Sequence, residues 1–473
     1  MVSQRLVFYC LPIVFCIIVL LIACGSDTAI SAPITSQWIW VSGSGMVNVS
    51  GVYGTQGEPS TNNTPAGRFG AVGWTDEGGN LWLFGGNENS SGVDELFNDL
   101  WEFTPANRTW TWVSGSNTTN ASGVYGTQDT SATDNMPGAR SGSVSWRDNN
   151  GNFLLFGGGG YDSNGVVGVL NDLWEFNLAN KTWTWVSGSN TTNASGMYGT
   201  QGASSTSNTP GARSGSVSWT DSSGNFWLFG GEGFAPGSMG VLNDLWEFNP
   251  ANNTWTWVSG SNTANAIGSY GSLGLSSSSN MPGARSGSVS WMDNSGNLWL
   301  FGGIGYVSSG NYGTLSDLWE FTPANKTWTW VSGSNITNAS GVYRTQGASS
   351  TSNTPGARSG SVSWTDRSGN FWLFGGGGYD STGVVGDLND LWEFNPTNNT
   401  WTWVSGSNTA NAIGSYGSLG LSSSTNMPGA RSGSLSWTDG SGNFWLFGGE
   451  GYGSAGLSGG ARGVLNDLWI NPL

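Results

Sequence analysis

The chain has 473 residues, a formal net charge of −16 and no histidine. The absence of histidine excludes a Ser-His-Asp arrangement and imidazole metal ligands, and two lysines are too few for a nucleic-acid-binding patch. All three cysteines lie within the first 24 residues, which leaves the rest of the chain without a thiol nucleophile, a disulfide or a cysteine-bound metal. We therefore expect no cofactor, no bound metal and no nucleic-acid partner.

The N-terminus has the pattern of an export signal. Arg5 precedes an apolar run over residues 6–23, and the run ends in Leu-Ile-Ala-Cys at Cys24. This ending resembles the bacterial lipoprotein signal, which implies that residues 1–23 are removed and that Cys24 is lipidated. An uncleaved signal anchor is the alternative, since the run is about as long as a short membrane helix. Residues 24–36 are polar and short, as expected of a tether.

The signal therefore indicates a location. A lipidated Cys24 would hold the exported protein at a membrane of the bacterial cell envelope, either the outer membrane or the cell surface.

Residues 37–473 consist of one sequence repeat that is present in six copies. Its closing Trp-x-Trp-Val motif recurs every 72 or 73 residues, which indicates a repeat architecture. The clearest copy predicts strands at 213–219, 226–231, 244–248 and 254–258, separated by turns rich in Gly, Asn, Asp and Pro. No part of the copy has a helical period. Four antiparallel strands in six copies predict an all-β, six-bladed propeller.

Particular residues of each copy resemble the kelch repeat. Arg213 and small residues precede the first strand, the second strand ends in Gly230-Gly231, and Trp255 follows about 25 residues later. The chain is therefore similar to kelch-repeat propellers of the galactose oxidase-like superfamily. Its repeat is longer than the usual ~50 residues, and Ser216 occupies a position where the family often has histidine.

The two ends of the repeat region complement each other. Residues 37–43 match the fourth strand of a blade but lack the three strands that should precede it. The last copy ends at residue 473 after its third strand. We expect the first strand to complete the last blade and close the ring, because closure removes exposed strand edges.

One arginine per copy is a candidate ligand-binding residue. Antiparallel strands bring this arginine, the Gly-Gly pair and an aspartate at the start of the third strand to one face. The arginines could form a ring that binds carboxylate or sulfate groups, or each could pair with its aspartate and fix the loops. They are Arg68, Arg140, Arg213, Arg285, Arg358 and Arg431.

The long loops of each copy are expected on the same face. They carry aromatic residues among Asn, Ser and Gly, a composition that suits recognition of a carbohydrate or a protein. The alternative is that the rings hold the loops in place. The candidate tyrosines are Tyr125, Tyr198, Tyr270, Tyr343 and Tyr416.

The tryptophans indicate packing instead of binding. Each copy has five tryptophan positions, and of the 30 only Leu154 is not tryptophan, which accounts for all 29 in the chain.

Two functions fit these observations. The first is a non-enzymatic binding or scaffold module for carbohydrate or protein. The second, implied by the kelch resemblance, is an extracellular carbohydrate-active enzyme similar to sialic acid epimerases. The copper chemistry of galactose oxidase is excluded, because residues 37–473 contain neither histidine nor cysteine. A cytoplasmic ubiquitin-ligase adaptor conflicts with the export signal. No copy differs at its channel mouth, as an enzyme would require, so we expect the binding module and assign no catalytic residue.

Overall fold

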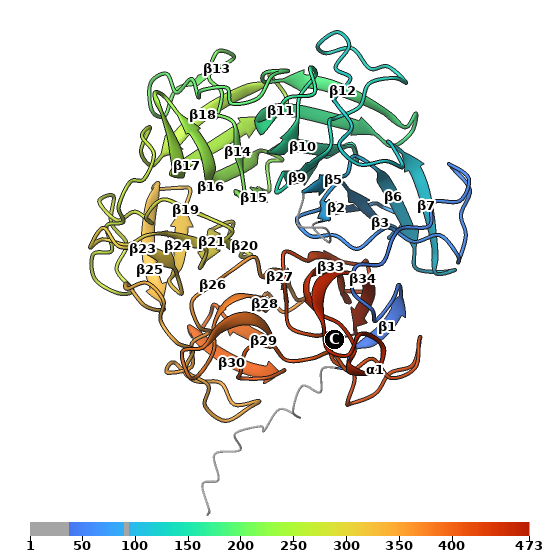
Figure 1. The fold of residues 1–473 in the computed structure, drawn as a ribbon. Coiled ribbons are helices and arrows are strands. Elements are labelled where there is room, and N and C mark those ends of the chain that lie inside the picture. The colour runs from blue at the N-terminus through green and yellow to red at the C-terminus, as the bar shows by residue number, and fades with distance from the viewer. Residues whose placement is uncertain (1–36, 89–93, 473) are drawn as a thin grey trace, which may run out of the picture. The chain divides into compact units, whose positions relative to one another are not determined.

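A computed structural model describes residues 37–88 and 94–472 (Figure 1). The predicted signal segment, Cys24 and the tether lie outside the described residues. Within residues 37–472 the chain forms small antiparallel sheets set around a common axis, so the fold is all-β and propeller-like (Figure 1). No helix in the described part of the chain is long and apolar enough to cross a bilayer.

Each of the first five repeats contributes four main strands, and the last contributes three. The first has β2 (Val72–Thr75), β3 (Leu81–Phe84), β6 (Leu100–Thr104) and β7 (Thr109–Ser114). The second has β9 (Val144–Arg147), β10 (Phe153–Tyr161), β11 (Val167–Asn177) and β12 (Thr182–Ser187). The third has β15 (Val217–Thr220), β16 (Phe226–Ala235), β17 (Ser238–Asn249) and β18 (Thr254–Ser259).

The other three repeats follow the same order. The fourth has β20 (Val289–Met292), β21 (Leu298–Phe301), β24 (Leu318–Thr322) and β25 (Thr327–Ser332). The fifth has β27 (Val362–Thr365), β28 (Phe371–Tyr379), β29 (Val385–Asn395) and β30 (Thr400–Ser405). The last has β32 (Leu435–Thr438), β33 (Phe444–Tyr452) and β34 (Arg462–Asn471), and β1 (Ile39–Ser42) pairs with β34.

Short elements supplement these strands. They are β4 (Asn87–Glu88), β5 (Glu95–Leu96), β8 (Arg140–Ser141), β13 (Ser204–Ser205), β14 (Arg213–Ser214), β19 (Arg285–Ser286), β22 (Ile304–Tyr306), β23 (Tyr312–Thr314), β26 (Arg358–Ser359), β31 (Arg431–Ser432) and the four-residue helix α1 (Ala455–Ser458). The sequence did not predict α1, which lies in an insertion found only in the last repeat.

The predicted first strand is split by a glycine in five of the six repeats, and in the first repeat only the part after the glycine, β2, forms a strand. In the third repeat, β14 and β15 are separated by Gly215, which has a φ of 65°. Its N–H donates to the carbonyl of Gly142 at 2.8 Å, and its own carbonyl accepts from the N–H of Gly287 at 2.8 Å. The six equivalent glycines form a closed cycle of backbone hydrogen bonds of 2.7 to 2.9 Å: Gly70, Gly142, Gly215, Gly287, Gly360 and Gly433.

The first strand of the chain pairs with the last, as the sequence predicted. Ile39 is opposite Ile470 and Trp40 is opposite Trp469 in an antiparallel register. Trp38 is fully buried and its ring lies 5.4 Å from that of Phe374, which belongs to the fifth repeat. The same inter-repeat contact joins Trp183 to Phe84.

The apolar core lies between neighbouring repeats. One cluster joins Val217 and Trp219 of the third repeat to Leu298 and Trp328 of the fourth. The indole N–H of Trp219 also donates across this boundary, to the carbonyl of Trp291 at 2.8 Å. Tryptophans therefore stabilise the stacking of repeats, as their regular positions predicted.

Candidate functional site

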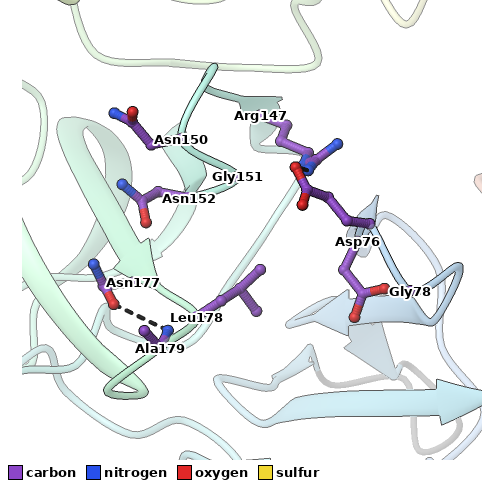
Figure 2. A pocket seen from close by; sticks show the side chains of 10 residues that line it. Asp76, Gly78, Arg147, Asn150, Gly151, Asn152, Asn177, Leu178 and Ala179 are labelled. Carbon is purple, nitrogen blue, oxygen red and sulfur yellow. Dashed lines mark hydrogen bonds and ion pairs between the residues drawn. The ribbon is translucent and has the colours of Figure 1, made fainter.

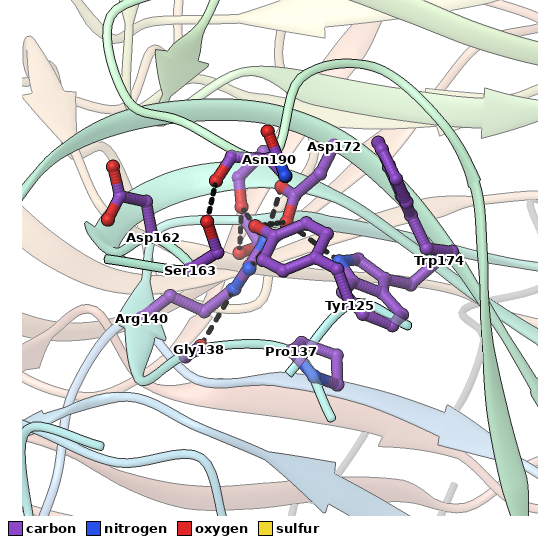
Figure 3. Close-up of polar contacts among 12 residues, drawn as sticks. Tyr125, Pro137, Gly138, Arg140, Asp162, Ser163, Asp172, Trp174 and Asn190 are labelled. Atoms are coloured by element: carbon purple, nitrogen blue, oxygen red, sulfur yellow. Dashed lines mark hydrogen bonds and ion pairs between the residues drawn. The ribbon is translucent and has the colours of Figure 1, made fainter. Parts of the chain in front are cut away.

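The predicted arginines lie inside the protein, and each pairs with an aspartate, as Figure 3 shows for Arg140. In the second repeat, Nη1 and Nη2 of Arg140 donate to the two carboxylate oxygens of Asp172, both at 2.7 Å. The same guanidinium donates from Nε to the carbonyl of Gly138 at 3.0 Å and from Nη1 to that of Gly157 at 3.0 Å. A bidentate pair with these added bonds satisfies most of the donors of the guanidinium.

The predicted tyrosine joins the same cluster. The hydroxyl of Tyr125 donates to Oδ2 of Asp172 at 2.6 Å, and the indole N–H of Trp174 donates to the same oxygen at 2.7 Å (Figure 3). Burial opposes the charge of Arg140, but Asp172 beside it holds the arginine pKa above its ordinary value. Burial and the negative charge of Asp172 also raise the pKa of Tyr125 above its usual range. The guanidinium therefore stays charged and the phenol stays neutral at physiological pH.

All six repeats contain this Arg–Asp–Tyr cluster. The arginines are about 1% exposed, and four of the five candidate tyrosines are buried, with Tyr343 half-buried. The geometry supports the structural alternative of the sequence analysis, because a ligand face would require these groups to be uncovered. The pairs are Arg68–Asp99, Arg140–Asp172, Arg213–Asp244, Arg285–Asp317, Arg358–Asp390 and Arg431–Asp467, and the candidate tyrosines Tyr125, Tyr198, Tyr270, Tyr343 and Tyr416 donate to the last five aspartates.

A different arginine lies in an open cleft between the first two repeats (Figure 2). Arg147 ends β9, where the other repeats have threonine or methionine, and its Nη2 donates to Oε1 of Glu77 at 2.9 Å. The Glu77 side chain is 81% exposed, and an exposed ion pair of this kind contributes only about 0.2–1 kcal/mol. A ligand can therefore replace Glu77 at little cost.

The cleft offers hydrogen-bonding groups and space. Its volume is about 640 Å³, and Asp76, Asn150, Asn152 and Asn177 line it together with Arg147 (Figure 2). Among the described residues, no acceptor reaches the buried Nε of Arg147. A buried N–H without a partner costs about 1–3 kcal/mol, so Arg147 is held less firmly in its present position than a fully hydrogen-bonded arginine would be.

A third group of charges joins the last two repeats. Nε of Arg462 donates to Oδ2 of Asp387 at 2.7 Å, and its Nη1 donates to Glu450. The hydroxyl of Ser432 donates to the other oxygen of Asp387 at 3.3 Å. The hydrogen bond from Arg462 to Asp387 is the main cause that raises the arginine pKa. The guanidinium of Arg462 therefore bridges Asp387 of the fifth repeat and Glu450 of the last, which suits a contact that holds the two repeats together.

The residues of the Arg147 cleft and of the Arg462 group were not predicted from the sequence. The sequence predicted no difference between repeats at the channel mouth, yet Asp387 and Arg462 make the fifth and sixth repeats differ from the others on the face of Arg431. Each site was visible in the sequence as a departure from the repeat pattern. Arg147 stands where most other repeats have threonine, Asp387 stands where most others have valine, and an insertion precedes Arg462. In the described ranges, no three or more Cys, Asp or Glu residues are grouped so that they could hold a metal ion.

Comparisons with known proteins give information about the fold alone. No family model matches the chain, and no curated protein matches it. A solved structure described as "Structure of YjhT" resembles it with a TM-score of 0.51 and 13% sequence identity, over 86% of this chain and 95% of that chain. A likeness at this identity concerns the fold alone, and it supports an all-β, propeller-like architecture for this chain.

Proposed function

We propose that this protein is a non-enzymatic binding module of the bacterial cell envelope, anchored by a lipid on Cys24, and that its ligand is a carbohydrate. Its scaffold is a kelch-type propeller of six blades, with the ring closed by β1. The cycle of six glycine hydrogen bonds and the pairing of β1 with β34 support this blade count and closure. The lipoprotein-like ending of the N-terminal signal supports the location.

The exposed ion pair of Arg147 with Glu77, which lies in an open polar cleft, is the observation that carries the proposal. Sugar hydroxyls both donate and accept, which matches a lining of guanidinium, carboxylate and amide groups. The cleft volume of about 640 Å³ lies within the range of small-ligand sites, roughly 300–1,000 Å³, and favours a sugar over a flat protein surface. Asp76 and Glu77 outnumber the one arginine, so the favoured sugar is neutral.

A glycan array tests this function. The full-length protein in detergent is screened beside Arg147→Ala and a matched control, Arg367→Ala, which removes an exposed arginine from the fifth repeat. We expect binding of neutral glycans that falls about 10- to 100-fold in Arg147→Ala, because hydrogen bonds to charged groups contribute about 1.5–3 kcal/mol. The control should bind like the wild type.

Equal binding by the two arginine variants would reject the cleft as the site. The absence of any glycan ligand for the wild-type protein would reject the carbohydrate proposal.

A further inference from the structure

The second repeat lacks one tryptophan that the other five repeats share. In those repeats the tryptophan lies in the second main strand and its indole N–H donates to the aspartate that opens the preceding turn. Trp227, for example, donates to Oδ2 of Asp221 at 3.0 Å. The equivalent bonds measure 2.9 to 3.0 Å: Trp82 to Asp76, Trp299 to Asp293, Trp372 to Asp366 and Trp445 to Asp439.

The indole ring also packs on the next repeat. The ring of Trp82 lies 6.0 Å from that of Phe176, and that of Trp227 lies 6.0 Å from that of Phe321. Each of these tryptophans therefore has two partners, a carboxylate that accepts its N–H and a phenyl ring of the following repeat.

Leu154 takes the place of this tryptophan in the second repeat, and a cavity of about 320 Å³ lies beside it. Asp148 and Phe248, the equivalents of the carboxylate and the phenyl ring, both line the cavity, as do Glu175 and Val186. The two partners of the missing indole therefore face the same space. The exposed residues Asn150 and Asn253 also line it, so the cavity is reached from the surface.

We propose that this cavity binds the indole ring of a ligand, with the ring N–H donating to Asp148 and the ring packing against Phe248. The ligand takes the position that a tryptophan side chain of the protein occupies in five repeats. The indole belongs either to a free small molecule or to a tryptophan side chain of a partner. This inference does not depend on the carbohydrate proposal, because it concerns a different cavity.

The size and charge of the cavity fit this ligand. Its volume exceeds that of an engineered apolar cavity of about 150 Å³ that binds benzene. Two carboxyl groups, those of Asp148 and Glu175, line the cavity, which favours a neutral ring with an N–H donor over an anionic aromatic compound. Asn150, a glycine or serine in the other repeats, donates to Oδ2 of Asp148 at 3.3 Å. This long bond to an exposed side chain is readily exchanged for the shorter one that an indole makes.

Calorimetric titration of the full-length protein in detergent tests the proposal. We expect one indole per chain and at least fivefold weaker binding of N-methylindole, which lacks the donor. Leu154→Trp should abolish binding, because the new side chain fills the cavity as in the other repeats. Trp227→Leu is the matched variant and should raise the stoichiometry to two by opening the same cavity in the third repeat.

Two results would overturn the proposal. One is unchanged indole binding by Leu154→Trp, which should fold because five repeats carry tryptophan at this position. The other is a wild-type protein that binds no indole up to its solubility. N-acetyltryptophanamide distinguishes the two sources of the ring. Binding at least as tight as that of indole identifies a tryptophan side chain as the ligand, and tenfold weaker binding identifies a free small molecule.

Discussion

Two arginines near the ends of one split strand show how burial decides what a charge can do. Arg140 and Arg147 both pair with a carboxylate, at 2.7 and 2.9 Å. The first pair is almost fully buried, whereas the second is 34% exposed at the arginine and 81% exposed at the glutamate. The buried pair is part of the structure, because neither group can leave without stranding its partner. The exposed pair can exchange its partner for a ligand.

The largest expected effect tests this contrast on stability. Arg140→Ala leaves Asp172 buried without its counter-ion, so we expect the free energy of unfolding to fall by about 5 kcal/mol, the upper end of the range for a broken buried pair. Arg147→Ala is the control and should cost no more than about 1 kcal/mol. Guanidinium denaturation followed by tryptophan fluorescence measures both. Similar losses in the two variants would remove the distinction.

A neighbouring pair of tryptophans extends the contrast to apolar groups. Trp38 is fully buried against the fifth repeat, whereas Trp40 is half-buried. Trp38→Ala should lower the free energy of unfolding by about 3–4 kcal/mol, because it leaves a large cavity where the ends of the chain meet. Trp40→Ala should cost less. A Trp38→Ala protein that melts at the wild-type temperature would argue against closure of the ring by β1.

The missing tryptophan allows the opposite test. Leu154→Trp adds an indole with an acceptor, Asp148, and a packing partner, Phe248, already in place. We expect the free energy of unfolding to rise by about 1 kcal/mol, a typical gain from filling a cavity. Val186→Trp, which enlarges another residue of the same cavity wall, serves as the control and should not stabilise the protein. A loss of stability in Leu154→Trp would mean that the cavity does not have the shape of the indole site in the other repeats.

The repeat pattern of the sequence predicted the fold. It did not show which of two similar residues is buried and which is exposed. The strand at 226–231, the pairing of the first strand with the last and the Arg213–Asp244 pair all follow from local patterns and antiparallel order. The burial of Arg213 depends on groups from other segments, among them Tyr198 and Asp244, and no local pattern encodes their contact. Leu154 was visible as a departure from the repeat. Its cavity was not, because the volume depends on whether Phe248 and Val186 close around the smaller side chain.

The smallest expected effect concerns a charge between the two extremes of burial. Glu393 is half-buried, and its Oε1 accepts a hydrogen bond from the side-chain amide of Asn370 at 2.7 Å. Burial, together with the negative charge of Asp366, raises the pKa of Glu393 to about 7. The folded state therefore holds this proton more tightly than the unfolded chain does. Its contribution to stability is fully present below pH 4.5 and is lost as the pH rises through 7.

Glu393→Gln isolates this contribution, because glutamine keeps the shape of the protonated side chain and does not titrate. Between pH 5 and 8 the wild-type protein should lose about 1 kcal/mol more stability than the variant, a modest figure because water screens a half-buried carboxyl group. Denaturation midpoints at a series of pH values measure the difference. Glu58→Gln, at an exposed loop position, controls for the loss of one negative charge and should leave the pH dependence of the wild type unchanged. If Glu393→Gln follows the wild-type curve as closely as this control does, Glu393 is ionised in the folded protein throughout the range and belongs with the exposed charges.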